Sequence, residues 1–169
     1  EFIDFEKDRE YTYKVLVIDS EFPRIDNNAG AYAATEEMKL LKGLGMRLVF
    51  APLNMAYLGK YTDNLRKLGI ESIYSPFFST VSQYIKKFGS QFDLIYTTRH
   101  YVADKVLDTI REYAPQAKVI FNNADLHFLR ELRDALVEDD EQKKEHALRT
   151  RDKELDLMKK VDLTLSYNE

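Results

Sequence analysis

The sequence predicts an α/β fold, with a doubly wound parallel sheet of about six or seven strands and helices on both faces. Apolar runs of strand length recur along the chain, and each run is continuous rather than alternating. Continuous runs suit strands that are buried on both faces of a sheet. Segments with a helical stripe of apolar residues separate these runs, so strands and helices alternate. This alternation favours parallel strands joined by right-handed crossovers.

Six apolar runs are the expected strands, at 15–18, 48–51, 72–74, 94–96, 119–121 and 163–165. The first helix should end at Gly43 and Gly45, and the second at Gly69, because glycine accepts the left-handed backbone that often closes a helix. Residues 124–160 are predicted to be helical, with a solvated acidic run at 138–141 between two apolar stripes.

The chain has 169 residues, which suits one domain rather than two. We assign residues 14–169 to a Rossmann-like domain and the acidic, aromatic residues 1–13 to an N-terminal arm without a predicted function. The chain begins without Met and stops just after an expected strand. We therefore expect it to be a segment of a longer polypeptide.

Composition excludes several classes of protein. The 25 basic and 29 acidic side chains give a net charge of −4, which disfavours a general nucleic-acid binder. There is no cysteine, and hence no disulfide, thiolate nucleophile or Cys-ligated metal, which is compatible with a reducing cytoplasm. No apolar run approaches the roughly 20 residues that cross a bilayer, and no signal-peptide pattern is present, so membrane insertion is not expected.

The candidate site lies at the carboxyl ends of the strands, where open parallel sheets bind ligands. Asn28, Ala29 and Gly30 follow the first strand and begin a helix. This turn either lets a phosphate approach backbone N–H groups or is a plain capped turn. The three-glycine dinucleotide motif and the Gly-Lys-Ser/Thr phosphate loop are both missing, which weighs against simple NAD-binding and nucleotide-triphosphatase functions.

Two further loops carry polar side chains. Asp125 and His127 follow the fifth run, where the imidazole could contact a sugar hydroxyl or developing charge, or could be merely structural. Residues 97–101 follow the fourth run and contain Arg99 and His100. They suit a polar, anionic or carbohydrate ligand, or else form an ordinary loop with Thr98 as the helix cap. No Asp-x-Asp or His-x-x-x-His pair occurs, so no metal centre is predicted.

Seven strings of residues follow one another in the order and spacing of a known family. They lie at 14–19, 23–30, 61–70, 92–94, 114–121, 125–131 and 161–166. On these strings, residues 12–169 resemble the N-terminal domain of a glycosyltransferase with two Rossmann-like domains, the GT-B architecture, in the family 4-like group.

That resemblance implies a retaining transferase that moves a sugar from a nucleotide-sugar donor to a glycan or other hydroxyl acceptor, as in polysaccharide biosynthesis. His127 would be catalytic, Asn28, Ala29 and Gly30 would approach the donor diphosphate, and Arg99, His100 and Asp125 would bind the acceptor or sugar. The resemblance implies no cofactor or metal. The C-terminal donor-binding domain would be missing, so this fragment would be inactive alone. The protein would be cytoplasmic, with any membrane attachment supplied by its other parts.

Two alternatives remain open. One is a non-catalytic, flavodoxin-like α/β module that binds a partner or a small anion through the same edge of the sheet. The other is half of a nucleotide-sugar epimerase with a similar two-domain architecture.

Overall fold

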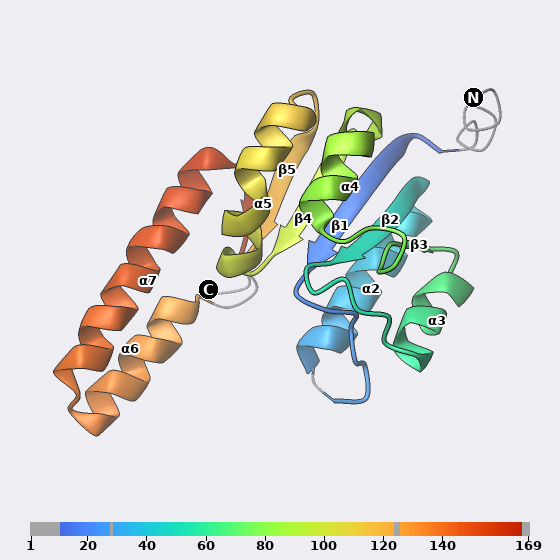
Figure 1. Ribbon diagram of the computed structural model, residues 1–169. Helices are drawn as coiled ribbons and strands as arrows, with labels where there is room; N and C mark the ends of the chain where they lie inside the picture. The colour runs from blue at the N-terminus through green and yellow to red at the C-terminus, as the bar shows by residue number, and fades with distance from the viewer. Residues whose placement is uncertain (1–10, 28, 124–125, 167–169) are drawn as a thin grey trace.

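The computed structural model describes residues 11–27, 29–123 and 126–166. Within them, six parallel strands form one sheet in the order β3-β2-β1-β4-β5-β6 (Figure 1). The strands are β1 (Tyr13–Asp19), β2 (Met46–Pro52), β3 (Glu71–Ser72), β4 (Leu94–Thr98), β5 (Lys118–Asn122) and β6 (Leu163–Leu165). The predicted doubly wound α/β fold is confirmed.

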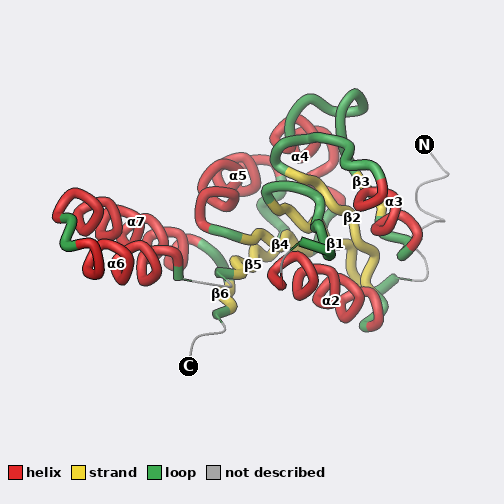
Figure 2. The backbone as a smooth tube through the Cα atoms, turned by 90° about the horizontal axis from the view of Figure 1, so that it is seen from below, coloured by secondary structure: helices red, strands yellow, loops and turns green. Residues whose placement is uncertain are grey.

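Helices cover both faces of the sheet, as Figure 2 shows. The helical segments are α2 (Ala29–Gly43), α3 (Lys60–Lys67), α4 (Val81–Phe88), the 3-10 turn η1 (Gly89–Gln91), α5 (His100–Tyr113), α6 (His127–Glu138) and α7 (Glu141–Lys160). Helices α2 and α3 pack on one face, and α4, α5 and the end of α7 pack on the other.

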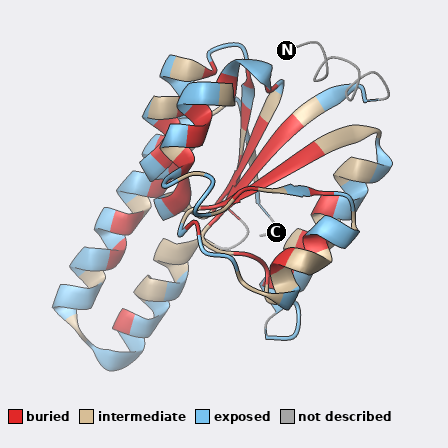
Figure 3. Ribbon diagram, turned by 45° about the vertical axis from the view of Figure 1, so that its right-hand side comes forward, coloured by how far each residue is buried: buried red, intermediate tan, exposed pale blue. Residues whose placement is uncertain are grey.

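The central strand β1 shows why its apolar run is continuous. Leu16 and Ile18 belong to the core beneath α4 and α5, whereas Val15 and Val17 belong to the core beneath α2 and α3. All four side chains are buried, and each contributes about 1.5–3 kcal/mol by leaving water. Figure 3 shows the same burial along the middle of the sheet. A strand that is covered by helices on both faces of the sheet has no solvent-exposed face for polar residues.

The chain winds outward from β1 in both directions. From β1 it runs through β2 to β3, and then returns to the other side of β1 to form β4, β5 and β6. The loops after β1 and β4 therefore diverge at neighbouring strand ends. In open parallel sheets this switch point is where a crevice forms.

The structure corrects two predicted boundaries. The third strand is predicted at 72–74 but comprises Glu71–Ser72; beyond it, the Ile73 N–H still donates to the Phe50 carbonyl of β2 at 2.9 Å, and the chain then turns, with the Ser75 N–H donating to the Met55 carbonyl. The predicted arm of residues 1–13 lies mostly outside the described residues, and its last residue, Tyr13, belongs to β1. Gly45 (φ 82°) and Gly69 (φ 72°) follow α2 and α3 in the left-handed region, as predicted.

Helices α6 and α7 form an antiparallel hairpin that extends away from the sheet (Figures 1 and 2). Asp139, in the left-handed region, ends α6, and the carboxylate of Asp140 caps α7 by accepting from the N–H groups of Gln142 and Lys143. The acidic run is thus a turn and helix cap, as expected. No helix in the described part of the chain is both long enough and apolar enough to cross a bilayer.

Asp162 fastens the last strand to the sheet. Its carboxylate accepts hydrogen bonds from the Val119 N–H at 3.0 Å, from Lys118 at 3.1 Å and from Arg111 at 3.1 Å. The Val119 N–H bond is the strongest influence on the Asp162 pKa. Burial opposes it, and the two cations assist it, so the pKa falls to about 2 from an ordinary value of 3.8.

We therefore expect Asp162→Ala to lower the free energy of unfolding by about 1–2 kcal/mol at pH 7. Because the pKa is lower in the folded state, this stabilisation is complete above about pH 4 and is lost as the pH falls from 4 towards 2. Urea unfolding of both proteins across this range measures it. Asp156→Ala, which removes an exposed partner of Lys160, is the control and should cost less than about 0.5 kcal/mol. Equal losses for the two variants would contradict the prediction.

Candidate functional site

The predicted site residues that the structure describes lie at one edge of the sheet. Strands β1, β4 and β5 run parallel, so the loops that follow them share that edge. Gly30 lies in the first turn of α2, next to Ala29, and both are exposed. His127 begins α6 after β5. The predicted convergence of the two loops is therefore found, whereas Asn28 and Asp125 lie outside the described residues.

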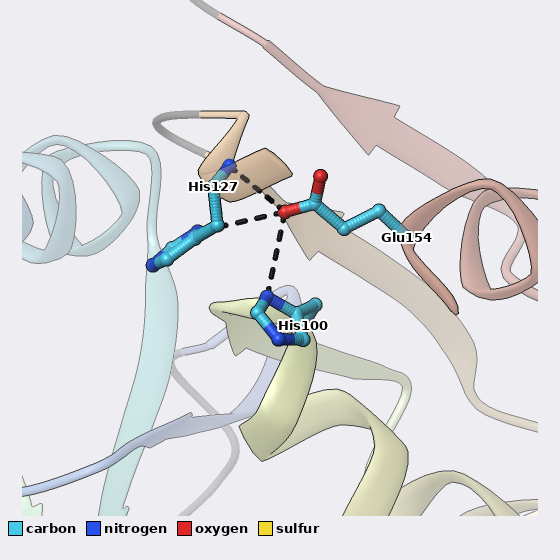
Figure 4. Close-up of side chains that lie close together, drawn as sticks. All are labelled: His100, His127 and Glu154. Carbon is cyan, nitrogen blue, oxygen red and sulfur yellow. Dashed lines mark hydrogen bonds and ion pairs between the residues drawn. The ribbon is translucent and has the colours of Figure 1, made fainter. Parts of the chain in front are cut away.

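The centre of this edge is a cluster of His100, His127 and Glu154 from three different helices (Figure 4). His100 begins α5, His127 begins α6, and Glu154 lies in α7. The Nδ1 atoms of His100 and His127 lie 3.4 and 3.5 Å from Oε1 of Glu154. The two rings meet edge to face, with centroids 4.9 Å apart. One carboxylate thus joins the starts of two helices.

Glu154 is fully buried and charged. Its Oε1 accepts a hydrogen bond from the His127 N–H at 3.0 Å, and Oε2 lies 3.5 Å from the Phe128 N. Burial by itself would raise the pKa of Glu154. The two imidazoles and the backbone N–H groups at the start of α6 outweigh burial and lower the pKa to about 2. The carboxylate also complements the positive end of the α6 dipole.

Both histidines are predicted from the sequence as site residues, but Glu154 is not, because it lies in a helix with many charged side chains. A signal was available in the spacing of α7. Its buried residues lie at intervals of three and four, and they are Ala147, Thr150, Glu154 and Leu157. A glutamate on this stripe must be buried, and a buried carboxylate needs partners.

Arg99 bridges the ends of β4 and β1. Its Nε donates to Oδ1 of Asp19 at 3.0 Å, and its backbone N–H donates to the Asn122 carbonyl at 3.2 Å. Partial burial disfavours the charged guanidinium, but Asp19 and Tyr101 overcome this and raise the pKa of Arg99. Arg99 also has a φ of 60°, a strained conformation for a residue with a side chain. Strain at a switch point is a common mark of a functional position.

Buried polar atoms without a hydrogen-bond partner gather beside Arg99. They are Oγ1 of Thr98, Nδ1 of His100 and both amide atoms of Asn123. Thr98 pairs with Asn122 in the ladder, so Arg99 and Asn123 occupy neighbouring positions just past the two strands. Thr98 does not cap α5, because the cap position is Arg99. Unpaired buried groups are rare in native proteins and need an explanation such as a ligand.

A second polar network holds α2 against the sheet. The hydroxyl of Tyr96 donates to Glu37 at 2.8 Å, and the amide of Asn122 donates to Glu37 at 3.1 Å and to the Tyr96 oxygen at 2.6 Å. Asn122 and Tyr96 are buried in the sheet, and Glu37 comes from α2. This network fixes α2 and, with it, the position of Gly30 at the carboxyl edge of the sheet.

No family model matches the chain, and no curated protein matches it. Solved structures do resemble it. The TrkA-N domain of the inner membrane protein ybaL from Escherichia coli is 12% identical with a TM-score of 0.53, over 93% of this chain and 88% of that one. A protein of unknown function from Vibrio parahaemolyticus RIMD 2210633 is 9% identical with a TM-score of 0.45, over 95% of this chain and 96% of that one. The first likeness supports a Rossmann-like fold.

These findings overturn the resemblance to a GT-B glycosyltransferase, since they support only a parallel Rossmann-like fold. The strings that suggested it lie largely in strands, strand-end turns and helix starts, which any Rossmann-like domain contains. Sugar transfer and polysaccharide biosynthesis are unsupported. The catalytic role of His127 and the donor and acceptor roles of the other residues rested on that resemblance.

The buried carboxylate predicts a large effect on stability. Glu154→Ala should lower the free energy of unfolding by about 3 kcal/mol, because it leaves the buried N–H groups at the start of α6 without their acceptor and removes the carboxylate that both imidazoles face. Glu154→Gln keeps a carbonyl acceptor and should cost about 1–2 kcal/mol. Urea unfolding at pH 7 measures both.

Glu145→Ala provides the matched control for Glu154, since Glu145 is an exposed glutamate of the same helix that pairs with Arg149. It should change the stability by less than about 0.5 kcal/mol. If Glu154→Ala lowered the free energy of unfolding by no more than this control, Glu154 would not be the residue that holds α7 to the starts of α5 and α6.

Proposed function

We propose that this chain is a non-catalytic binding module that holds a small anionic ligand at the carboxyl edge of its sheet, beside Arg99. The Rossmann-like fold supports this function better than sugar transfer. In such folds the crevice at the switch point receives ligands because loops diverge there and backbone N–H groups face outward. In this chain the switch point lies between β1 and β4.

The observation that carries the proposal is the amide of Asn123. The residue is 1% exposed, and neither its side-chain nitrogen nor its side-chain oxygen has a hydrogen-bond partner among the described residues. Leaving a buried donor or acceptor unpaired costs about 1–3 kcal/mol each. A ligand that both accepts from and donates to this amide removes the cost.

The charges around Asn123 favour an anion. Arg99 is a cation whose guanidinium is 39% exposed, so a ligand can reach the groups that Asp19 does not use. Helix α5 begins at His100 without a side-chain cap and without an acidic residue in its first turn. The uncapped N–H groups and the helix dipole attract negative charge. The ligand class is therefore a small anion that also bears neutral hydrogen-bonding groups.

The proposal is one of binding rather than catalysis because the candidate acid–base groups already have structural partners. Asp19 is held by Arg99 and by the Ser20 N–H, and Glu154 is held by two helix starts. Removing either carboxylate from these partners for chemistry would expose buried charge.

Pyrophosphate serves as the probe, with binding followed by calorimetry and by NMR shifts of backbone amides. We expect saturable shifts at His100 and Tyr101, and about a 10-fold loss of affinity in Arg99→Ala, the size of one charge-assisted hydrogen bond. The control is Arg151→Ala, which removes an exposed arginine paired with Asp152 on α7 and should leave affinity unchanged. Equal affinity for both variants would contradict the proposed site.

Asn123→Leu separates a binding role from a folding role. Leucine is close in size and has no polar atoms, so the variant should match or exceed the parent in stability while it weakens pyrophosphate binding. Thermal unfolding without ligand and calorimetry with pyrophosphate give the two readouts. A variant that lost stability and kept its affinity would show that Asn123 acts in folding.

A further inference from the structure

The cluster of His100, His127 and Glu154 offers three metal-ligand atoms that all lie within 4.8 Å of one another. We propose that it binds a divalent cation of the zinc class. This inference goes beyond the proposed function, because the cation would bind whether or not an anion occupies the edge beside Arg99.

The distances favour a cation over a direct hydrogen bond. Nδ1 of His100 and Nδ1 of His127 lie 3.4 and 3.5 Å from Oε1 of Glu154. These separations exceed the 2.7–3.2 Å of N–H···O hydrogen bonds. Two ligands bound tetrahedrally to Zn²⁺, with bonds of about 2.0–2.1 Å, are separated by about 3.4 Å. Both nitrogen–oxygen separations therefore match those of two ligands of one tetrahedral ion.

The carboxylate is oriented for this role. Oε1 of Glu154 accepts one hydrogen bond from the His127 N–H at 3.0 Å, which leaves its second lone pair for a cation. Oε2 lies near the N–H of Phe128, so the start of α6 orients the whole group. Hydrogen bonds that fix the orientation of a metal-ligating side chain are typical of metal sites.

The charge balance points the same way. Glu154 is fully buried, and the two side chains that face its Oε1 are imidazoles, which are themselves common metal ligands. Backbone N–H groups contribute only partial charges, whereas a buried ion in a protein is normally matched by a counter-charge or a metal. A divalent cation supplies that counter-charge.

His100 adds independent evidence. Among the described residues its buried Nδ1 has no hydrogen-bond partner within normal geometry, although it faces Oε1 of Glu154 at 3.4 Å. An imidazole nitrogen and a carboxylate oxygen both become ligands if a cation lies between them. The third histidine of the chain differs, since His146 has a side chain that is 66% exposed and lies 3.9 Å from Glu131.

The donor set selects the class of ion. Two imidazole nitrogens and one carboxylate oxygen suit Zn²⁺ and similar transition metals, whereas Ca²⁺ and Mg²⁺ prefer oxygen ligands alone. Three protein ligands also leave a fourth tetrahedral position for water or another ligand. The sequence could not show this set, because its members come from α5, α6 and α7 and share no short motif.

The test uses the full chain, stripped with a chelator and then titrated with Zn²⁺ by calorimetry and with Co²⁺ by visible absorption. We expect one ion per chain and the visible bands of a four-coordinate Co²⁺ site. His100→Ala and His127→Ala should each weaken Zn²⁺ binding by about 100-fold or more, since even the loss of an outer-shell partner costs 10–100-fold. His146→Ala is the matched control and should bind like the parent.

Glu154→Gln keeps an acceptor for the start of α6 while it removes the charge, and it should also lose the Co²⁺ bands. Circular dichroism confirms that each variant is folded. No uptake of Zn²⁺ by the parent, or equal uptake by His100→Ala and His146→Ala, would overturn the site. Pyrophosphate titration in the presence of the chelator tests the proposed function separately, and Zn²⁺ titration in phosphate-free buffer tests this inference alone.

Discussion

The carboxyl edge of the sheet depends on one buried carboxylate. Glu154 reaches from α7 to the first residues of both α5 and α6, and it satisfies N–H groups that the start of α6 would otherwise leave unpaired. A few residues further on, Leu157 packs into the core beneath α5. One helix therefore fixes two helix starts and is itself held by the core. The positions of His100 and His127 follow from this arrangement.

The sheet positions the rest of the site from both of its faces. The loops that follow β1 and β4 diverge at the switch point. The ion pair between Arg99 and Asp19 links the end of β4 to the end of β1. On the α2 face, Glu37, Tyr96 and Asn122 form a polar network beside the apolar core beneath α2 and α3. A network of satisfied hydrogen bonds holds α2 in place, and a rigid scaffold favours a defined binding edge.

The fold could be predicted from the sequence, and the site only in part. Continuous apolar runs such as 15–18 identify strands buried on both faces, and glycines such as Gly69 mark helix ends, because both signals are local. His100 and His127 were found because they follow strands. Glu154 and Asn123 were not, since their importance lies in burial that only the tertiary structure reveals. The resemblance to glycosyltransferases was wrong for a related reason. The matched segments reflect the residue types that a Rossmann-like sheet needs, and proteins of many functions share that sheet.

The unpaired polar atoms distinguish this edge of the sheet from the apolar core. Apolar residues at Thr98 or Asn123 would avoid the cost of unpaired buried groups, about 1–3 kcal/mol for each. A domain of this size has a free energy of unfolding of only about 5–15 kcal/mol, so the cost of these unpaired groups is large beside it. A ligand that pairs with them binds the native state alone and raises its stability in proportion to the logarithm of the ligand concentration. The same polar groups that weaken the free domain would thus make its stability respond to the ligand.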